Sequence, residues 1–447
     1  MTPRHRALLT LACAAQFMVV LDVSIVNVAL PSIQADLRVS PAGLQWVVNA
    51  YALPFAGLLL LGGRLADVCG LRRVFVLGLA LFTLASLAGG LAGAQGPLIA
   101  ARAFQGLGAA LLAPATLTVL TTAFAEDVRP RALAAWTAVG LAGGTAGNLA
   151  GGVLTEALSW RWILLVNVPV GALALLCSGL LPDGRGERRR LDVPGAVLAT
   201  AGVASLTYGV TRGWNAPALA GGAAALAAFT VLQSRARHPL LPLRLLRIRT
   251  VAAGNAAMLL AGACLNPMWF FLALSMRNVL HLSALQTGLG FLPHTLLTMA
   301  VVLRVTPRLM KRAADRTLIA AGALIAAAGF LWQSRLSPGG AYLPDVLGPA
   351  ILISAGGGLL GTPLTAAVTS GVPPGDAGAA SGLMNTAKQM GAALGLAVLA
   401  TVAVDYSDAF LAMAALLIAT AATARALLPA RPGRDRVRPA PARHPSA

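Results

Sequence analysis

The chain has 447 residues, of which 57% are apolar and only 11% are charged, and its formal net charge is +19. This composition excludes an ordinary soluble domain. The basic residues lie mostly in alternate loops between long apolar runs, which argues against a nucleic-acid binder. The apolar runs are about 20 residues long, enough to cross a hydrocarbon core of about 30 Å. We therefore expect an all-α polytopic membrane protein.

Fourteen membrane spans are predicted from these apolar runs. They lie near residues 7–30, 43–62, 74–94, 97–121, 132–156, 161–181, 193–211, 216–233, 251–274, 284–303, 317–334, 343–366, 378–403 and 409–426. The first run is apolar only from Ala7 to Ala12 before Cys13, too short for the hydrophobic part of a signal peptide, and it continues past Asp22. We therefore expect it to be an uncleaved span.

The loops fall into two sets that differ in charge. Both termini and the loops on their side carry 27 of the 34 Lys and Arg residues, and the opposite loops carry five. Cytoplasmic loops retain positive charge, so both termini are predicted to be cytoplasmic and the number of spans even. A faint repeat relates "GGRLADVCGLRR" after the second span to "PRLMKRAADRT" after the tenth. This spacing fits two six-helix units around a central pair.

The first span contains Asp22, in the stretch "LDVSIVNVALPSI". A charged residue at mid-span costs about 2.5–3.5 kcal/mol, so Asp22 is expected to face protein or a water-filled cavity. There it could load and release a proton, or it could be a structural carboxylate paired with a basic residue. On a helical wheel Ser24 and Asn27 lie about 60° apart, and Asp22 lies about 140° from Asn27. One polar face is expected to line a cavity and the other to bond a neighbouring helix.

Two basic residues also lie inside predicted spans. Arg102 stands in "ARAFQGLGAALLAP", with Gln105 and Gly106 on its helix face. It is a candidate partner for a carboxylate, or it could extend to the membrane interface. Lys388, in "MNTAKQMGAALG", is either a cavity residue or one half of a static salt bridge.

Small and aromatic residues give weaker indications. In "GLAGGTAGNLAGG", Gly143, Gly147 and Gly151 repeat every four residues, which predicts close helix packing and could also serve a conformational change. Aromatic side chains could bind a lipophilic cation or a planar compound, although most aromatics in membrane proteins pack or anchor at the interface. The aromatic candidates are Trp46, Tyr51, Phe55, Trp136, Trp269, Phe270 and Phe271.

Enzyme signatures are missing from the sequence. It has no Gly-Lys-Ser/Thr phosphate loop, no His-Glu-x-x-His and no Gly-x-Ser-x-Gly. The four cysteines are scattered and predict neither a disulfide framework nor a zinc site. We expect no enzyme activity, no metal and no cofactor, so any transport would draw on an ion gradient or on a partner.

Five stretches together resemble the fourteen-helix drug:proton antiporter branch of the major facilitator superfamily. "LDVSIVNVALPSI" looks like the first-helix signature, and "GGRLADVCGLRRVFVLG" resembles the loop motif after the second helix. In that loop Val68 and Leu71 replace two usual basic residues. The matching loop residues are Asp67, Gly70, Arg72 and Arg73.

The other three stretches follow in the family's order. "ARAFQGLGAALLAPA" resembles the fourth-helix motif, and "PPGDAGAASGLMNTAKQMGAALGLAVL" resembles the thirteenth helix. "GNLAGGVLTEALSWRWILLVNVPVG" resembles the fifth-helix antiporter motif, with Asn148 where proline is usual, followed by Gly151 and Gly152. The match covers residues 7 to 403.

The resemblance implies a major facilitator fold of 14 transmembrane helices in a 6+2+6 order, with two pseudo-symmetric six-helix bundles. The bundles would be residues 1–181 and 251–428, the central pair and basic loops 182–250, and a basic cytoplasmic tail 429–447. It implies alternating access, with the loop residues Asp67 to Arg73 controlling the conformational change.

The resemblance also implies proton-coupled efflux of small amphipathic drugs, antibiotics or secondary metabolites from a bacterial cell membrane, by a monomer in the lipid bilayer. Asp22, with Arg102, would couple protons to transport. A transporter of a specific metabolite, such as an amino acid or sugar, is an alternative, and a membrane receptor or scaffold is a remote one. Candidates for the substrate cavity are Asn27, Trp46, Tyr51, Gln105, Trp136, Trp269, Phe270 and Lys388.

Overall fold

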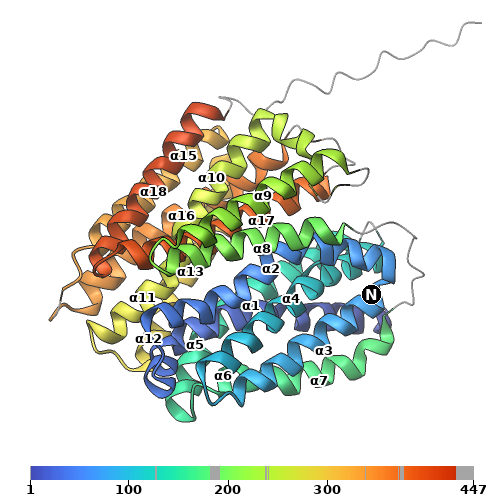
Figure 1. The fold of residues 1–447 in the computed structure, drawn as a ribbon, viewed down its shortest axis with the longest axis horizontal. Helices are drawn as coiled ribbons and strands as arrows, with labels where there is room; N and C mark the ends of the chain where they lie inside the picture. Colours follow the sequence, from blue (N-terminus) through green and yellow to red (C-terminus); the bar gives the residue numbers. More distant parts are fainter. Residues whose placement is uncertain are drawn as a thin grey trace, which may run out of the picture.

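The computed structural model describes residues 2–125, 128–181, 192–236, 239, 241–337, 339–370, 372 and 377–428. Across these ranges the chain forms helices and no β-strand, which confirms the all-α expectation. Figure 1 shows two groups of long helices, one from each half of the chain, with a helical pair between them. The basic loop near residue 185 and the tail 429–447 lie outside the described residues.

The first half of the chain contains six helical runs, one for each predicted span. They are α1 (Pro3–Leu37), α2 (Pro41–Cys69), α3 (Leu71–Gly90), α4 (Gln95–Ala123), α5 (Arg129–Ala157), and a last run of α6 (Trp162–Leu165), α7 (Asn167–Cys177) and η1 (Ser178–Leu180). The side chain of Thr2 caps the first helix by accepting the backbone N–H of His5. Ser40 caps α2 in the same way through Gly43.

The central pair consists of α8 (Val193–Thr211) and α9 (Ala216–Arg235). It lies between the two groups of helices in Figure 1. Small residues hold it close to both: Gly57 of α2 lies against Thr200 of α8, and Thr401 of the second half donates a hydrogen bond to the carbonyl of Val210 at 3.5 Å. The inserted pair therefore contacts both halves of the molecule.

The second half also contains six helical runs that match the predicted spans. They are α10 (Arg249–Leu265) with α11 (Pro267–Asn278), α12 (Ala284–Gly290) with α13 (Leu292–Ala300), η3 (Val301–Val305) and α14 (Thr306–Met310), α15 (Asp315–Gln333), η4 (Leu343–Leu347) with α16 (Gly348–Thr369), α17 (Ala377–Val402), and α18 (Tyr406–Leu427). The short turn η2 (Leu243–Arg247) precedes them. Pro267 marks the break between α10 and α11. Asn266 before it keeps helical backbone angles, and the proline itself has no backbone N–H to continue the helical hydrogen bonds.

Twelve helical runs in the described chain are long and apolar enough to cross a membrane. The protein is therefore a multi-pass membrane protein. Two further helices, α5 with 29 residues and α17 with 26, have the required length but are not among the twelve. Both are rich in Gly, Ala and Thr, and α17 carries Lys388, so their sequences are less apolar. The count of fourteen spans stays a prediction.

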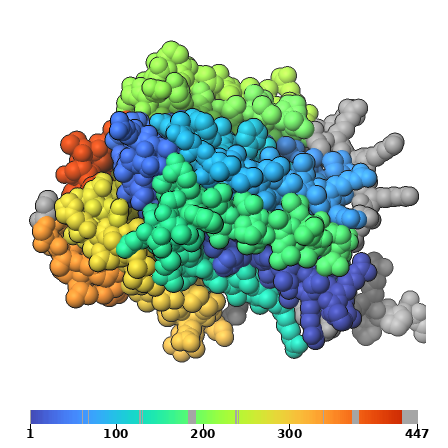
Figure 2. Space-filling model, turned by 90° about the horizontal axis from the view of Figure 1, so that it is seen from below, coloured from blue at the N-terminus to red at the C-terminus, as the bar shows by residue number. Residues whose placement is uncertain are grey.

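The buried core is shared most extensively between the two halves at one end of the molecule, and a smaller cluster joins Leu53 of α2 with Ala393 of α17. The cluster at that end joins residues of both halves, such as Ile25 and Leu30 with Phe271. A second cluster, from Leu8 to Leu181, contains first-half residues alone. Figure 2 shows the yellow segment of the second half lying against the blue and green first half. The two halves are thus packed together at the end opposite to the chain termini.

Candidate functional site

Asp22 and Arg102 form a buried ion pair between α1 and α4. One carboxylate oxygen of Asp22 lies 2.5 Å from Nη1 of Arg102. Both side chains are almost fully buried, with 0% of Asp22 and 2% of Arg102 exposed. Arg102 therefore does not reach the membrane interface. Its predicted partnership with a carboxylate is present in the structure.

Three further polar side chains complete the surroundings of this pair. The other oxygen of Asp22 accepts hydrogen bonds from Nε2 of Gln105 at 3.0 Å and from Nδ2 of Asn167 at 3.1 Å. Gln105 also accepts from Arg102 at 2.9 Å and donates to Oγ of Ser86 at 2.7 Å. Helices α1, α3, α4 and α7 thus meet at one carboxylate.

Arg102 has two more contacts on the side of α2. Its Nε donates to the carbonyl oxygen of Val47 at 3.2 Å. Its guanidinium lies over the ring of Tyr51, 4.5 Å from the ring centre, in a cation–π contact. Removing one member of a buried pair costs about 3–5 kcal/mol, because the other charge stays desolvated. Protonation of Asp22 would remove its charge and leave Arg102 as an uncompensated cation in the same place.

Glycines of α5 determine how closely α1 approaches this network. A Cβ atom added at Gly143 would lie 3.1 Å from the carbonyl oxygen of Phe17, and one at Gly147 would lie 2.7 Å from that of Leu21. One at Gly151 would lie 2.9 Å from the carbonyl oxygen of Ile25. The predicted glycine face therefore packs directly on the backbone of α1, on both sides of Asp22.

An adjacent face of α5, about 100° around the helix, contacts the second half of the chain. A Cβ atom at Gly152 would lie 2.8 Å from the carbonyl oxygen of Ala284, and one at Gly288 would lie 2.5 Å from that of Asn148. Asn148 is buried, with 2% of its surface exposed, and the helix continues through it without a break. The described residues give its side-chain amide no hydrogen-bond partner.

Glu156 links the two halves at the end of α5. Its Oε2 accepts hydrogen bonds from Oγ of Ser283 at 2.6 Å and from the backbone N–H of Leu285 at 2.7 Å. Ser283 also caps α12, so the carboxylate lies at a helix N-terminus, where negative charge is favourable. The sequence analysis had not given Glu156 a role. The only sign of this role in the sequence was a charged residue near the end of a predicted span.

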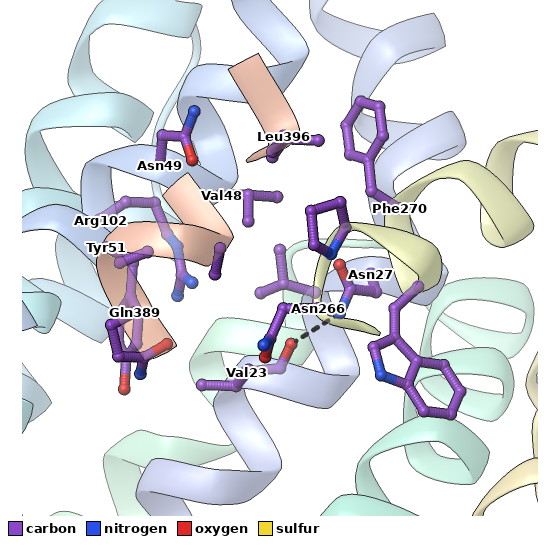
Figure 3. Close-up of a pocket in the computed structure, with 15 residues that line it drawn as sticks. Val23, Asn27, Val48, Asn49, Tyr51, Arg102, Asn266, Phe270, Gln389 and Leu396 are labelled. Carbon is purple, nitrogen blue, oxygen red and sulfur yellow. Dashed lines mark hydrogen bonds between the residues drawn. The ribbon is translucent and has the colours of Figure 1, made fainter. Parts of the chain in front are cut away.

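A small pocket lies between the two halves beside the ion pair (Figure 3). Its volume is about 80 Å³. In the view of Figure 3, Arg102, Tyr51 and Gln389 lie on one side and Phe270 on the other. The remaining lining residues are Val23, Val26, Asn27, Val48, Asn49, Ala52, Asn266, Pro267, Trp269, Ala392 and Leu396.

Four predicted cavity residues line this pocket, namely Asn27, Tyr51, Trp269 and Phe270. The two polar faces predicted for α1 are confirmed, because Asn27 faces the pocket whereas Asp22 bonds α4 and α7.

The other four predicted cavity residues do not line this pocket, and their part in a substrate cavity stays a prediction. They are Trp46, Gln105, Trp136 and Lys388. Trp46 packs beside α8 near Tyr208, and its ring centre lies 6.3 Å from that of Tyr208. Trp136 belongs to the first-half core and donates to Oγ1 of Thr116 at 3.2 Å. Gln105 is fully buried in the Asp22 network. Aromatic and polar residues on these helices serve packing, which residue type alone does not distinguish from ligand contact.

Three polar lining residues that were not predicted come from α2, from the junction of α10 and α11, and from α17. Asn49 is 1% exposed, and neither polar atom of its side chain has a hydrogen-bond partner among the described residues. Asn266 and Gln389 contribute two further amides. An amide within an apolar run was the available signal for all three.

The loop motif after the second helix is short in the structure. Gly70 alone separates α2 from α3, with φ of 93°, a backbone conformation that favours glycine. Arg73 is exposed, and Arg72 is partly buried with its guanidinium near Gly179. The side chain of Asp67 lies outside the described part of the chain. The control function predicted for this loop stays a prediction.

A second, larger cavity lies beside the central pair. Its volume is about 420 Å³, and its wall is almost wholly apolar. Helices α2, α8, α9, α10 and α17 supply most of that wall. Its few polar lining residues are Thr200, Thr230, Asn255 and Thr386. Asn255 and Thr386 each have a buried oxygen without a described partner.

Comparison with known proteins gives consistent matches over most of the chain. A family model described as Major Facilitator Superfamily matches residues 12–396. The chain is 57% identical to the cephamycin export protein of Amycolatopsis lactamdurans, over 92% of this chain and 90% of that one. It is 42% identical to the puromycin resistance protein of Streptomyces alboniger, with 92% and 84% covered, and 36% identical to the lincomycin resistance protein of Streptomyces lincolnensis, with 86% and 81% covered.

Solved structures show the same fold at low sequence identity. A peptide transporter of the POT family, in complex with sulfate, superposes with a TM-score of 0.74 at 16% identity, over 94% of each chain. The xylose transporter of E. coli gives a TM-score of 0.68 at 13% identity, with 95% of this chain and 97% of that chain covered. These likenesses concern the fold alone.

Proposed function

The chain belongs to the major facilitator superfamily, whose members matched here are transporters rather than enzymes, and on that premise we propose that it exports small amphipathic compounds, antibiotics among them, in exchange for protons. The observation that carries the proton part is the buried pair of Asp22 and Arg102 beside the pocket. The names of the three relatives, which refer to export of or resistance to antibiotics, support the substrate class.

In this proposal Asp22 alternates between two states of protonation. As a carboxylate it holds Arg102 through the ion pair and accepts from Gln105 and Asn167. A proton on Asp22 removes the Coulomb attraction, and Arg102, which lines the pocket, must then find another partner or water. The state of one carboxylate thereby changes the charge at the pocket wall, which links proton binding to substrate binding.

We further propose a topology of fourteen spans with both termini in the cytoplasm. The basic loops favour this orientation, and the lengths of α5 and α17 allow both to cross. The packed end with Glu156 and Ser283 then faces outward. The conformation described here would be the one closed to the outside. One chain holds both halves of the cavity, so a monomer suffices.

The pocket favours amphipathic ligands. Trp269, Phe270 and Leu396 offer apolar surface, and Asn27, Asn49 and Gln389 offer amides. Its volume of about 80 Å³ is below the 300–1,000 Å³ typical of drug-sized sites, so it accommodates only part of a ligand in this conformation. The rest of the ligand would extend toward the cytoplasmic end.

The test is a susceptibility panel in a bacterial host that lacks its own efflux pumps. Expression of the chain should raise the inhibitory concentration of several amphipathic antibiotics. A protonophore should abolish the difference, and Asp22→Asn at equal expression should not produce it. Protection that survives the protonophore would contradict proton coupling, and no protection against any compound would contradict export.

A further inference from the structure

Helix α17 has a polar face next to the pocket. Ser381, Asn385, Lys388 and Gln389 follow one another at spacings of four, three and one residues. At 100° per residue, Lys388 lies about 40° from Ala392 on the helix surface. Ala392, together with Gln389 and Leu396, lines the pocket. Lys388 is therefore about two turns of helix before Leu396, on the flank of the pocket face.

The other faces of α17 are occupied by protein. Gly391 and Gly395 pack against the backbone of α10 at Leu259 and Ala263. Met390 packs in the cluster that joins α2 and α8. Lys388 lies between the α10 contact and the pocket face, and its side chain is nonetheless exposed. Lys388 is not among the residues that line either pocket. Because charged side chains inside membrane spans almost always face the protein interior or a water-filled cavity, we expect it to face the space between the two halves rather than lipid.

Lys388 has no ion-pair partner among the described residues. The only described carboxylate deep inside the helices is Asp22, and it is already paired with Arg102. The other described acidic side chains lie at helix ends. They are Asp36, Glu156, Asp192, Asp315, Asp345, Asp405 and Asp408. Among the described residues, the static salt bridge considered for Lys388 therefore lacks an acid, and its positive charge is uncompensated.

We propose that Lys388 binds the anionic group of the substrate. Resting on the export function proposed above, this inference names the substrate class as amphipathic monoanions, such as carboxylates. The apolar part of such a molecule would contact Trp269, Phe270 and Leu396 in the pocket. Its carboxylate would lie at the ammonium of Lys388, which supplies three N–H donors. An anion there neutralises a charge that the membrane interior otherwise disfavours.

Binding of a matched pair of probes tests this inference. Dansylglycine carries a carboxylate, and dansylglycinamide has nearly the same size without the charge. Purified protein in detergent would be titrated with each, and dansyl emission excited through protein tryptophans would report binding. Hydrogen bonds to charged groups favour the carboxylate by about tenfold to a hundredfold in Kd. This readout requires neither a proton gradient nor transport.

Three variants assign the effect to Lys388. Lys388→Gln should remove the preference for the carboxylate and leave the affinity for the amide unchanged, whereas Lys388→Arg should retain it. Lys311→Gln changes the only other lysine, exposed after α14, and should behave as the parent. Equal melting temperatures would establish that all variants are folded.

Three results would overturn the inference, two of them in binding and one in transport. The first is a parent protein without preference for the carboxylate, and the second is a preference that persists in Lys388→Gln. Failure of the proposed export function would give a different result from failure of the anion site. No compound would then be transported, but the binding preference for the carboxylate would remain. Conversely, export of neutral and cationic drugs that does not depend on Lys388, with no export of anions, would refute the anion site alone.

Discussion

Replacing Gly147 by alanine perturbs the packing of α5 on α1 beside the proton-binding carboxylate. The added Cβ atom would lie 2.7 Å from the carbonyl oxygen of Leu21 and 2.8 Å from Cβ of Ser24. Ordinary contact begins at 3.4 Å, so α1 must move away by about 0.7 Å. The carbonyl oxygen belongs to the helix backbone and cannot turn aside, so the whole helix must shift. Overpacking of this kind costs about 1–3 kcal/mol.

The same shift would disturb Asp22, because it follows Leu21 in the chain. Its hydrogen bonds to Gln105 and Asn167, at 3.0 and 3.1 Å, have little room to lengthen. We therefore expect Gly147→Ala to lower the melting temperature in detergent and to slow proton-driven transport at matched expression. Gly144→Ala is the control, since its Cβ atom would lie 3.7 Å from Oγ of Ser24, in ordinary contact. Parent-like stability and transport in Gly147→Ala would refute the close approach of the two helices.

Three further predictions concern topology and the outer contact. In a cysteine-free background, a cysteine at Gly433 should react only with membrane-permeant reagents in intact cells, whereas one at Gly340 should react with impermeant reagents. Labelling of position 433 from outside would contradict the topology with an even number of spans. Asn148→Pro should slow efflux more than Asn148→Ala, because a proline ring clashes with the preceding turn and would move the carbonyl group of residue 148 that packs on Gly288. A proline variant that exports as fast as the parent would contradict this. Glu156→Ala should increase labelling of the pocket from outside, because it removes two hydrogen bonds between the halves, whereas unchanged labelling would deny Glu156 a part in closing that end.

The helices of this protein were predictable because apolar runs of spanning length leave few alternatives. Each of the fourteen predicted runs corresponds to one helical run in the structure. The ends of the helices were less predictable, because polar residues at the ends of a membrane helix carry no hydropathy signal. Helix α1, for example, begins at Pro3 and continues to Leu37, beyond the apolar run. The break at Pro267 has a sequence signal in the proline itself, but the span around it is uniformly apolar.

The site was predictable where one helix carried the signal. The wheel of α1 separated Asp22 from Asn27 correctly, and the spacing of Arg102 and Gln105 placed them on one face. Asn167 and Ser86 were missed because their contact with the network depends on how α7 and α3 pack, which periodicity does not contain.

The aromatic residues illustrate the same limit. Trp269 lines the pocket and Trp136 does not, although both are single tryptophans in apolar helices. The two tryptophans differ in whether they lie on the side of the helix that faces the other half of the chain. That arrangement is a property of the assembled bundle rather than of any one segment.

The central claim is that Asp22 couples proton movement to export, and the most direct test measures both fluxes in reconstituted vesicles. A pH gradient should drive substrate accumulation by the parent, and substrate addition should release protons. Asp22→Asn should abolish both effects and retain exchange of labelled for unlabelled substrate without a gradient. That exchange also proves that the variant is folded despite the unpaired Arg102. Proton release and gradient-driven accumulation at the parent's rate in Asp22→Asn would contradict the account.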